Sequence, residues 1–323
     1  MISFKDFLSE DKVVAWKVKE LSLKKIINML NAECSDGLKA IHNGSILYRG
    51  FSKGRKEASG FQFIDTTKAE RTSRDTNNLY QLMMDNSEAL KGYPKRKNSL
   101  ICATRLDTAD GYGHLRIIIP FNGTKVAALD SYSDIFNIHL KSPIYKKGVR
   151  DLCNDVEGVL SDMYFPDDDR YDNIGKINNF LAKKSVTDVI DEFVHRADSG
   201  ATRALIEKTL KAAPKNERFT ALSTLVMTPE SIGVQLYTYG DVLPVQKKVG
   251  VEAWFSGKAL SMDLDIFCDI LVKLEKEQDF TIGAAIKQDV KSAFNDALDR
   301  YDSAHEKKSL KKSKGKNDDL YDF

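Results

Sequence analysis

Residues 98–129 read NSLICATRLDTADGYGHLRIIIPFNGTKVAAL, a stretch in which apolar runs alternate with polar breaks. The apolar runs at 98–104 and 114–120 are short and bounded by turn-forming residues, which is typical of buried strands. Between them lie a polar turn and a segment containing Ala109 and Tyr112 that predicts a short helix. The stretch therefore predicts two strands of a sheet joined by a short helical connection.

The remaining sequence surrounds this core with further strands and helices. Strands are also expected at 46–51, 61–66, 234–239 and 250–262. Helices are expected at 13–33, at 76–90 with Asp75 or Thr76 as N-cap, and as a pair over 263–302 that breaks near Asp279. Residues 132–228 have a mainly helical pattern and predict an insertion. The predicted fold class is α+β.

Composition excludes several functional classes. The 49 basic and 47 acidic residues nearly balance, so net charge does not favour nucleic-acid binding. No apolar run approaches the roughly 18 residues of a membrane span, and the N-terminus lacks the layout of a secretion signal. The cysteines and histidines are scattered, so no metal site is predicted.

The C-terminal region carries a local excess of positive charge. The segment KKSLKKSKGK (307–316) contains six lysines and no acid. Such a composition cannot bury enough apolar surface to fold alone, so a flexible tail is expected over 303–323. A solvated tail is the preferred interpretation, and a weak DNA contact through the lysines is the alternative.

Arg49 stands inside the apolar run ILYRGF (46–51), which otherwise has the pattern of a buried strand. An arginine is rarely fully buried without a partner that matches its charge. The sequence therefore predicts an anionic group, a carboxylate or a phosphate, beside Arg49.

The early strand with Arg49, the stretch 98–129 and a late strand with Glu252 in VEAWFSG (251–257) occur in an order that resembles the mono-ADP-ribosyltransferase family. In that family an early strand supplies an arginine, a middle strand Ser-Thr-Ser, and a late strand a glutamate after a substrate-recognition loop. The resemblance covers 46–129 and 234–262. It implies an ADP-ribosyltransferase-like split β-sandwich core within residues 11–262, with 132–228 as the insertion and 263–302 as a helical C-terminal section.

The resemblance also implies a role for individual residues, with NAD as substrate and no metal. Arg49 would grip the NAD pyrophosphate through two hydrogen bonds, which a lysine cannot copy. Glu252 would stabilise the cationic ribosyl group that forms when nicotinamide leaves. Thr104 would brace the pocket from the middle strand, and Tyr112 or Phe61 would stack on the nicotinamide.

A second phosphate ligand is expected at Arg74. The segment RTSRDTNNLY (71–80) that contains it is similar to one found in phage virion proteins. The alternative interpretation is an ordinary capped start of a helix.

Two positions depart from the family pattern. Aligned on CATRLD (102–107), Ser-Thr-Ser becomes Ala103, Thr104 and Arg105, so the serine that supports the glutamate is missing. Two residues before Glu252, where members that modify arginine carry a second glutamate, this chain has Gly250. The departures leave three alternatives: another acceptor, NAD hydrolysis or an inactive site.

The first ten residues, MISFKDFLSE, place Phe4, Phe7 and Leu8 on one face of a short amphipathic helix. The segment resembles the capsid-targeting peptides of internal head proteins in T-even-like phages. The resemblance implies contact with the head scaffold or capsid during assembly, and cleavage by the prohead protease after Leu8-Ser9-Glu10.

Together these resemblances predict an ADP-ribosyltransferase that is packaged in a phage head and delivered into the host cytoplasm to modify a host macromolecule. One alternative is a non-catalytic internal head protein that keeps the fold. Another is a packaging protein that associates with DNA through the lysine tail.

Overall fold

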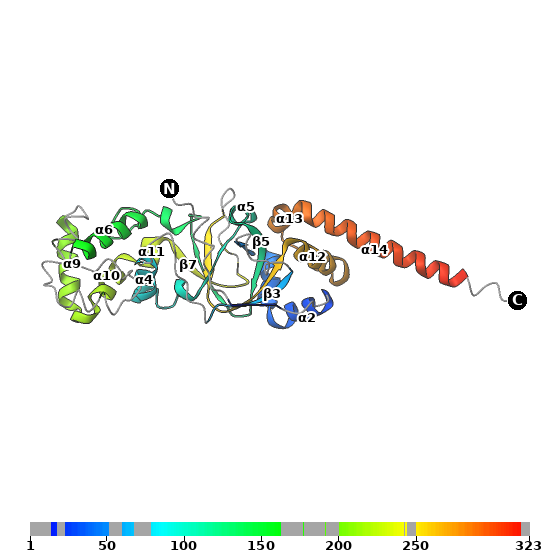
Figure 1. The fold of residues 1–323 in the computed structure, drawn as a ribbon, viewed down its shortest axis with the longest axis horizontal. Helices are drawn as coiled ribbons and strands as arrows, with labels where there is room; N and C mark the ends of the chain where they lie inside the picture. The colour runs from blue at the N-terminus through cyan, green and yellow to red at the C-terminus, as the bar shows by residue number, and fades with distance from the viewer. Residues whose placement is uncertain are drawn as a thin grey trace.

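The protein is described here by a computed structural model (Figure 1). It describes residues 14–17, 23–51, 60–67, 79–162, 200–241 and 250–317, together with the single residues 177, 191 and 243.

A single sheet of nine strands forms the centre of the described chain, in the order β1-β3-β9-β5-β2-β4-β8-β6-β7. Every neighbouring pair of strands is antiparallel. The strands are β1 (Val14–Lys17), β2 (Leu47–Phe51), β3 (Phe61–Asp65), β4 (Leu100–Ala103), β5 (His114–Pro120), β6 (Lys125–Leu129), β7 (Val234–Thr238), β8 (Glu252–Phe255) and β9 (Lys258–Asp263). With helices on both sides of this sheet, the fold is α+β, as the sequence predicts.

Helices cover both faces of the sheet, and each group builds its own hydrophobic core (Figure 1). The first group is α2 (Leu23–Glu33), α3 (Ser35–Asn43), α12 (Leu264–Gln278), α13 (Ala284–Asp289) and α14 (Lys291–Asn317). The second is α4 (Leu79–Asn86), α6 (Val149–Asp162), α9 (Gly200–Ala212), α10 (Arg218–Val226) and α11 (Pro229–Ile232). The short α5 (Leu106–Asp110) follows β4.

The two central strands β4 and β8 are buried along their whole length. Alternate side chains point to opposite faces of a strand, and here they enter opposite cores. Leu100 and Phe255 belong to the first core, whereas Ile101 and Trp254 belong to the second. This double burial explains why β4 reads as a continuous apolar run rather than an alternating one.

The helical insertion predicted over 132–228 lies between two neighbouring strands of the sheet. β6 and β7 pair directly, from Lys125 opposite Thr238 to Leu129 opposite Val234. The described helices α6, α9, α10 and α11 all fall between these two strands in the sequence. In the described residues, the chain between β6 and β7 is thus mainly helical, and the insertion itself stays a prediction.

The predicted secondary structure needs correction in three places. Residues 14–17 form β1 rather than the start of a helix, because their backbone pairs with the distant strand β3, with Val14 opposite Asp65. β6 is not predicted, since its alanines carry little strand propensity and its pairing with β7 and β8 supplies the stability. The single strand expected over 250–262 is two strands, β8 and β9, separated at Gly257 with φ 138°. They do not pair with each other, because β8 pairs with β4 and β6 whereas β9 pairs with β3 and β5.

The predicted helix at 76–90 appears as α4 followed by a 3₁₀ turn, Glu88–Leu90. The proposed N-caps, Asp75 and Thr76, lie outside the described residues. No helix in the described ranges combines the length and apolar character needed to cross a membrane.

The break predicted near Asp279 is confirmed, because Asp279 adopts a left-handed conformation, φ 51°, at the end of α12. Two helices follow it instead of one. The flexible tail expected from residue 303 is wrong up to Asn317, because α14 continues as a helix to that residue. Figure 1 shows α14 leaving the body of the protein along its second half.

We predict that deleting residues 303–323 leaves the melting temperature within about 2 °C of wild type, because surface changes have small effects on stability. Phe294 and Ala297 are buried against the first core, whereas residues 302–306 are exposed. Phe294→Ala is the matched contrast and should lower the free energy of unfolding by roughly 3 kcal/mol. Thermal unfolding followed by circular dichroism measures both. A large loss on truncation would mean that the end of α14 packs on the protein.

Candidate functional site

The three segments of the predicted site come together on adjacent strands. Arg49 lies on β2, Thr104 directly follows β4, and Glu252 begins β8. In the sheet these strands are hydrogen-bonded neighbours in the order β2-β4-β8. Arg49 and Glu252 lie more than 200 positions apart in the sequence. The fold brings their strands to either side of β4 at the centre of the sheet.

Arg49 is buried, with 1% of its surface exposed. Its Nη1 atom donates a hydrogen bond to the carbonyl oxygen of Ile101 on β4. Its guanidinium carbon also lies 5.0 Å from the centre of the Phe51 ring, a cation–π distance. A carbonyl and an aromatic ring therefore contact the charge, and the anionic partner expected from the sequence stays a prediction.

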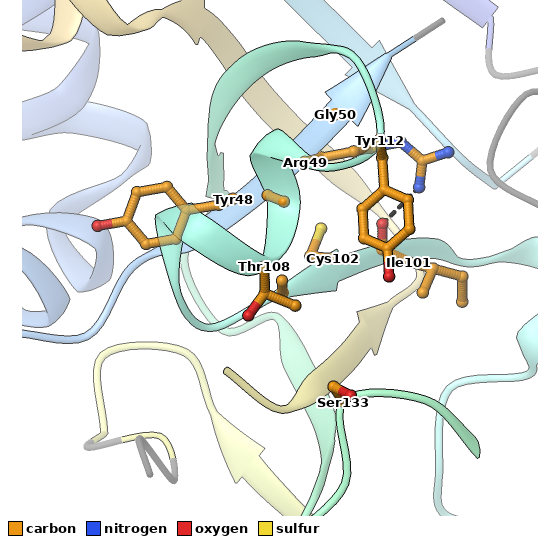
Figure 2. Close-up of a pocket in the computed structure, with 10 residues that line it drawn as sticks. Tyr48, Arg49, Gly50, Ile101, Cys102, Thr108, Tyr112 and Ser133 are labelled. Carbon is orange, nitrogen blue, oxygen red and sulfur yellow. Dashed lines mark hydrogen bonds between the residues drawn. The ribbon is translucent and has the colours of Figure 1, made fainter. Parts of the chain in front are cut away.

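Tyr112 lies beside Arg49 because α5 packs closely on β2. A Cβ atom at Gly50 would lie 2.5 Å from the Ala109 carbonyl oxygen and 2.7 Å from Tyr112 Cβ. Only glycine fits at such a distance, so Gly50 sets the approach of the helix to the strand. Figure 2 shows the side chains of Tyr48 and Arg49 leaving β2 in opposite directions, with Arg49 next to Tyr112.

A depression that encloses about 10 Å³ lies over these residues (Figure 2). That is room for about one water molecule and far below the roughly 300–1,000 Å³ typical of small-molecule sites. It takes its walls from β2, β4, α5 and the loop after β6. Its lining residues are Tyr48, Arg49, Gly50, Ile101, Cys102, Ala103, Thr108, Ala109, Tyr112 and Ser133.

Thr104 is buried and holds the entry to β8 rather than lining the depression. Its Oγ1 accepts a hydrogen bond of 3.0 Å from the Val251 backbone nitrogen. Its own backbone nitrogen donates to the Val251 carbonyl oxygen at 3.1 Å. Thr104 therefore fixes the residue directly before Glu252 through the backbone, and its role in bracing an NAD pocket stays a prediction.

Glu252 forms a fully buried ion pair with Arg96, and both side chains have 0% exposure. Oε1 accepts a hydrogen bond from Arg96 Nη1, and Oε2 lies 3.4 Å from the Ile135 backbone nitrogen that donates to it. The Glu252 backbone nitrogen donates to the Tyr132 carbonyl oxygen at 3.0 Å. The carboxylate is thus enclosed by protein groups and does not line the depression.

Arg96 is the main site residue that the sequence does not reveal. It begins the 3₁₀ turn Arg96–Asn98, and its guanidinium carbon lies 4.8 Å from the Trp254 ring centre and 5.5 Å from that of Tyr80. Burial by itself lowers the pKa of Arg96, but Glu252 and Tyr80 together raise the pKa above its ordinary value. Arg96 therefore stays charged opposite Glu252.

Both departures from the family pattern have a structural explanation. Ala103 is the direct register partner of Glu252, so no hydroxyl faces the carboxylate from β4, and Arg96 supplies the hydrogen bond instead. At Gly250 a Cβ atom would lie 2.6 Å from Thr108 Oγ1 and 2.8 Å from Arg105 Cβ. A glutamate does not fit at position 250 in this arrangement.

A second buried arginine, Arg116 on β5, is the register partner of Arg49. It donates to Asp263 Oδ1 at 2.9 Å, to Ser261 Oγ at 2.6 Å and to the Gly60 carbonyl oxygen at 2.6 Å. These bonds tie β5 to β9 and to the start of β3. Arg116 therefore has a structural role.

Several predicted site residues are not placed at the depression. Arg74, Leu8 and Glu10 lie outside the described residues, as does the whole segment 244–249 that precedes β8. Phe61 lies on β3, which β9 and β5 separate from β2 in the sheet. Tyr112 is therefore the aromatic residue of the predicted pair that lines the depression. Within the described chain, no group of three or more His, Cys, Asp or Glu side chains is arranged to hold a metal ion.

We predict that Arg96→Met lowers the free energy of unfolding by roughly 3–5 kcal/mol, because it leaves the Glu252 charge buried without its partner. The double variant Arg96→Met/Glu252→Gln should recover part of this loss, since the isolated charge is gone. Urea denaturation measures both variants.

Lys91→Met is the matched control, because Lys91 pairs with Glu88 at 3.4 Å on the exposed surface. Its effect should stay within about 0.5 kcal/mol. An Arg96→Met protein as stable as wild type would show that the buried ion pair does not form in solution.

Comparison of the chain with protein-family models, with curated proteins and with solved structures finds no match in any of the three. Any functional conclusion therefore has to be argued from the residues and their arrangement.

Proposed function

We propose that the protein is an ADP-ribosyltransferase that uses NAD, built on an ADP-ribosyltransferase-like core. The observation that carries this proposal is the placement of Arg49, Thr104 and Glu252 on the adjacent strands β2, β4 and β8. The three residues follow the arginine, threonine and glutamate order of the family, and the strands that carry or precede them are neighbours in the sheet. The small depression beside Arg49 and Tyr112 is where we propose that the ligand enters.

Arg49 and Tyr112 have the chemistry to hold one end of NAD. A guanidinium binds phosphate oxygens in two parallel hydrogen bonds, and an aromatic ring can stack on the flat nicotinamide. The depression encloses about 10 Å³, room for about one water molecule, so the lining side chains must move apart before nicotinamide can enter. We propose that the nicotinamide and its ribose bind there once it has opened, with the pyrophosphate at Arg49.

Glu252 would act on the charge that develops in the reaction. When the bond between nicotinamide and ribose breaks, the ribosyl ring becomes cationic, and a nearby carboxylate stabilises it. The Arg96 guanidinium holds this carboxylate in a fully buried ion pair and helps to enclose it. Turnover therefore requires the Glu252 side chain to move from its buried position toward the depression.

The delivery part of the proposal comes from the first ten residues, which lie outside the described chain. We propose that the head scaffold or capsid of a phage recruits the protein through MISFKDFLSE and that the prohead protease removes this peptide. The protein would then act in the host cytoplasm on a host macromolecule. The lysines of 307–316 offer a weak DNA contact during packaging.

A second candidate function is a non-catalytic internal head protein with the same fold. The observation that favours it is the complete burial of Glu252 in its ion pair with Arg96. A buried ion pair holds the surrounding structure in one arrangement. The residues Ala103 and Gly250, which replace a serine and a glutamate of the family pattern, also fit a site that no longer turns over NAD.

We predict that two substitutions separate NAD binding from chemistry. Arg49→Lys should weaken NAD binding, because the two-pronged geometry of the guanidinium is lost. Glu252→Gln should leave binding nearly unchanged yet lower turnover by about 10²-fold or more, the usual effect of removing one electrostatic stabiliser. Calorimetry with NAD and a nicotinamide-release assay measure the two quantities.

Unfolding curves of both variants are the control, since both residues are buried. Wild type that binds NAD without releasing nicotinamide supports the non-catalytic candidate. Wild type that binds no NAD contradicts both candidates, and Arg49 is then a structural arginine of β2.

We also predict that protein recovered from phage particles begins at Asp11, whereas protein expressed alone retains residues 1–10. Mass spectrometry of the intact chain distinguishes the two forms. The control is a Glu10→Ala variant, which removes the proposed cleavage signal and should keep the peptide in particles. Intact N-termini in mature wild-type particles would argue against the delivery proposal and leave the core chemistry untouched.

A further inference from the structure

The depression beside Arg49 is closed, because the space that it encloses has room for about one water molecule. Its floor consists of β2 and β4, and each of these strands is paired on both sides within the sheet. Ser133 lines the depression from the loop after β6, which is hydrogen-bonded to β8. The other three lining residues, Thr108, Ala109 and Tyr112, lie between β4 and β5 (Figure 2). This segment is therefore the wall that can move without breaking the sheet.

The segment between β4 and β5 is suspended between two fixed points. Thr104 exchanges two hydrogen bonds with Val251, and Leu106 packs against the first core. At the other end Gly113, with φ 131°, stands directly before β5. A positive φ favours glycine, and small residues at the ends of elements commonly absorb the backbone change of a hinge. Residues 107–112 can therefore turn about their ends while the flanking strands stay in place.

Residues 107–112 are held down by a hydrogen bond and by close packing. Thr108 Oγ1 accepts a hydrogen bond of 3.2 Å from the Gly250 backbone nitrogen. The segment also rests directly on β2, where a Cβ atom at Gly50 would lie 2.5 Å from the Ala109 carbonyl oxygen and 2.7 Å from Tyr112 Cβ. The net effect of one neutral hydrogen bond on stability is small, so the bond from Gly250 can break while the rest of the chain stays folded.

We propose that residues 107–112 form a lid that closes the depression and that the lid opens when the hydrogen bond from Gly250 to Thr108 breaks. Opening carries Tyr112 away from Arg49 and exposes the floor of the depression, including Cys102, to solvent. The inference goes beyond the proposed NAD chemistry, because it rests on contacts within the chain and holds whichever ligand enters.

The thiol of Cys102 reports on the position of the lid. Cys102 lines the depression and is 5% exposed, whereas Cys34, Cys153 and Cys268 are buried elsewhere in the two cores. Opening of the lid exposes Cys102 alone, but unfolding of the chain exposes all four thiols. Brief treatment of the full chain with N-ethylmaleimide, followed by mass spectrometry of its peptides, gives the labelling rate of each cysteine. Each rate is compared with that of the same cysteine in wild type.

Thr108→Val should raise the labelling rate of Cys102 by roughly 5-fold, because it removes the acceptor of one hydrogen bond and conserves the size of the side chain. The rates at the other three cysteines should not change. Gly50→Ala should raise the rate at Cys102 by roughly 10-fold or more, because the added methyl group forces the lid away from β2.

Thr66→Val is the matched control, because Thr66 Oγ1 accepts the same kind of hydrogen bond, 2.8 Å from the Gly257 backbone nitrogen, beyond the other end of β8. It should leave the labelling rate of Cys102 unchanged. An unchanged rate at Cys102 in Thr108→Val, or an equal rise at all four cysteines in that variant, would overturn the lid. So would a rise at Cys102 in Thr66→Val as large as in Thr108→Val. The experiment uses no NAD, so failure of the transferase proposal leaves its outcome untouched.

Discussion

The buried ion pair between Arg96 and Glu252 is the interaction on which the arrangement of the site depends. Two charges removed from water are very costly unless each stays bound to the other, so moving or replacing either residue alone lowers stability. The pair joins the 3₁₀ turn before β4 to the first residue of β8. The rings of Tyr80 and Trp254 near the guanidinium add α4 to the same cluster. One buried contact thus fixes the helices of the second core against the centre of the sheet.

This arrangement sets a conflict between stability and catalysis. A carboxylate stabilises developing positive charge best when it is free to face the substrate, but Glu252 is neutralised by Arg96 and enclosed by the loop after β6. Any movement of Glu252 toward the depression weakens the ion pair and loosens that loop. Binding of a cationic ribosyl group offers the one compensation, because it supplies a new positive charge. The transferase and the non-catalytic candidate differ in whether that compensation suffices.

The sequence predicts the central strands well because they are local apolar runs. It predicts that β2, β4 and β8 lie close together because the resemblance to the transferase family implies it. It does not predict β1 or β6, whose pairing partners lie far away in the chain. The role of Arg96 is not predicted from the sequence for a similar reason. In KRKN (95–98) it reads as one of three exposed basic residues, and indeed Lys95 and Lys97 are exposed. Only the three-dimensional structure reveals that the middle residue turns inward to a carboxylate that lies 156 positions away.

The missing serine at 103 and the missing acid at 250 look like losses when each is considered alone. In the structure, a guanidinium takes the place of a hydroxyl beside Glu252, and close packing against Arg105 and Thr108 excludes any side chain at 250. A hydrogen bond from a charged donor is stronger than one from a neutral donor, so Arg96 holds the Glu252 carboxylate more firmly than a serine hydroxyl would. The same change encloses the carboxylate, because the ion pair is fully buried and the loop after β6 contacts its second oxygen. Firm positioning of Glu252 and its access to the depression therefore oppose each other.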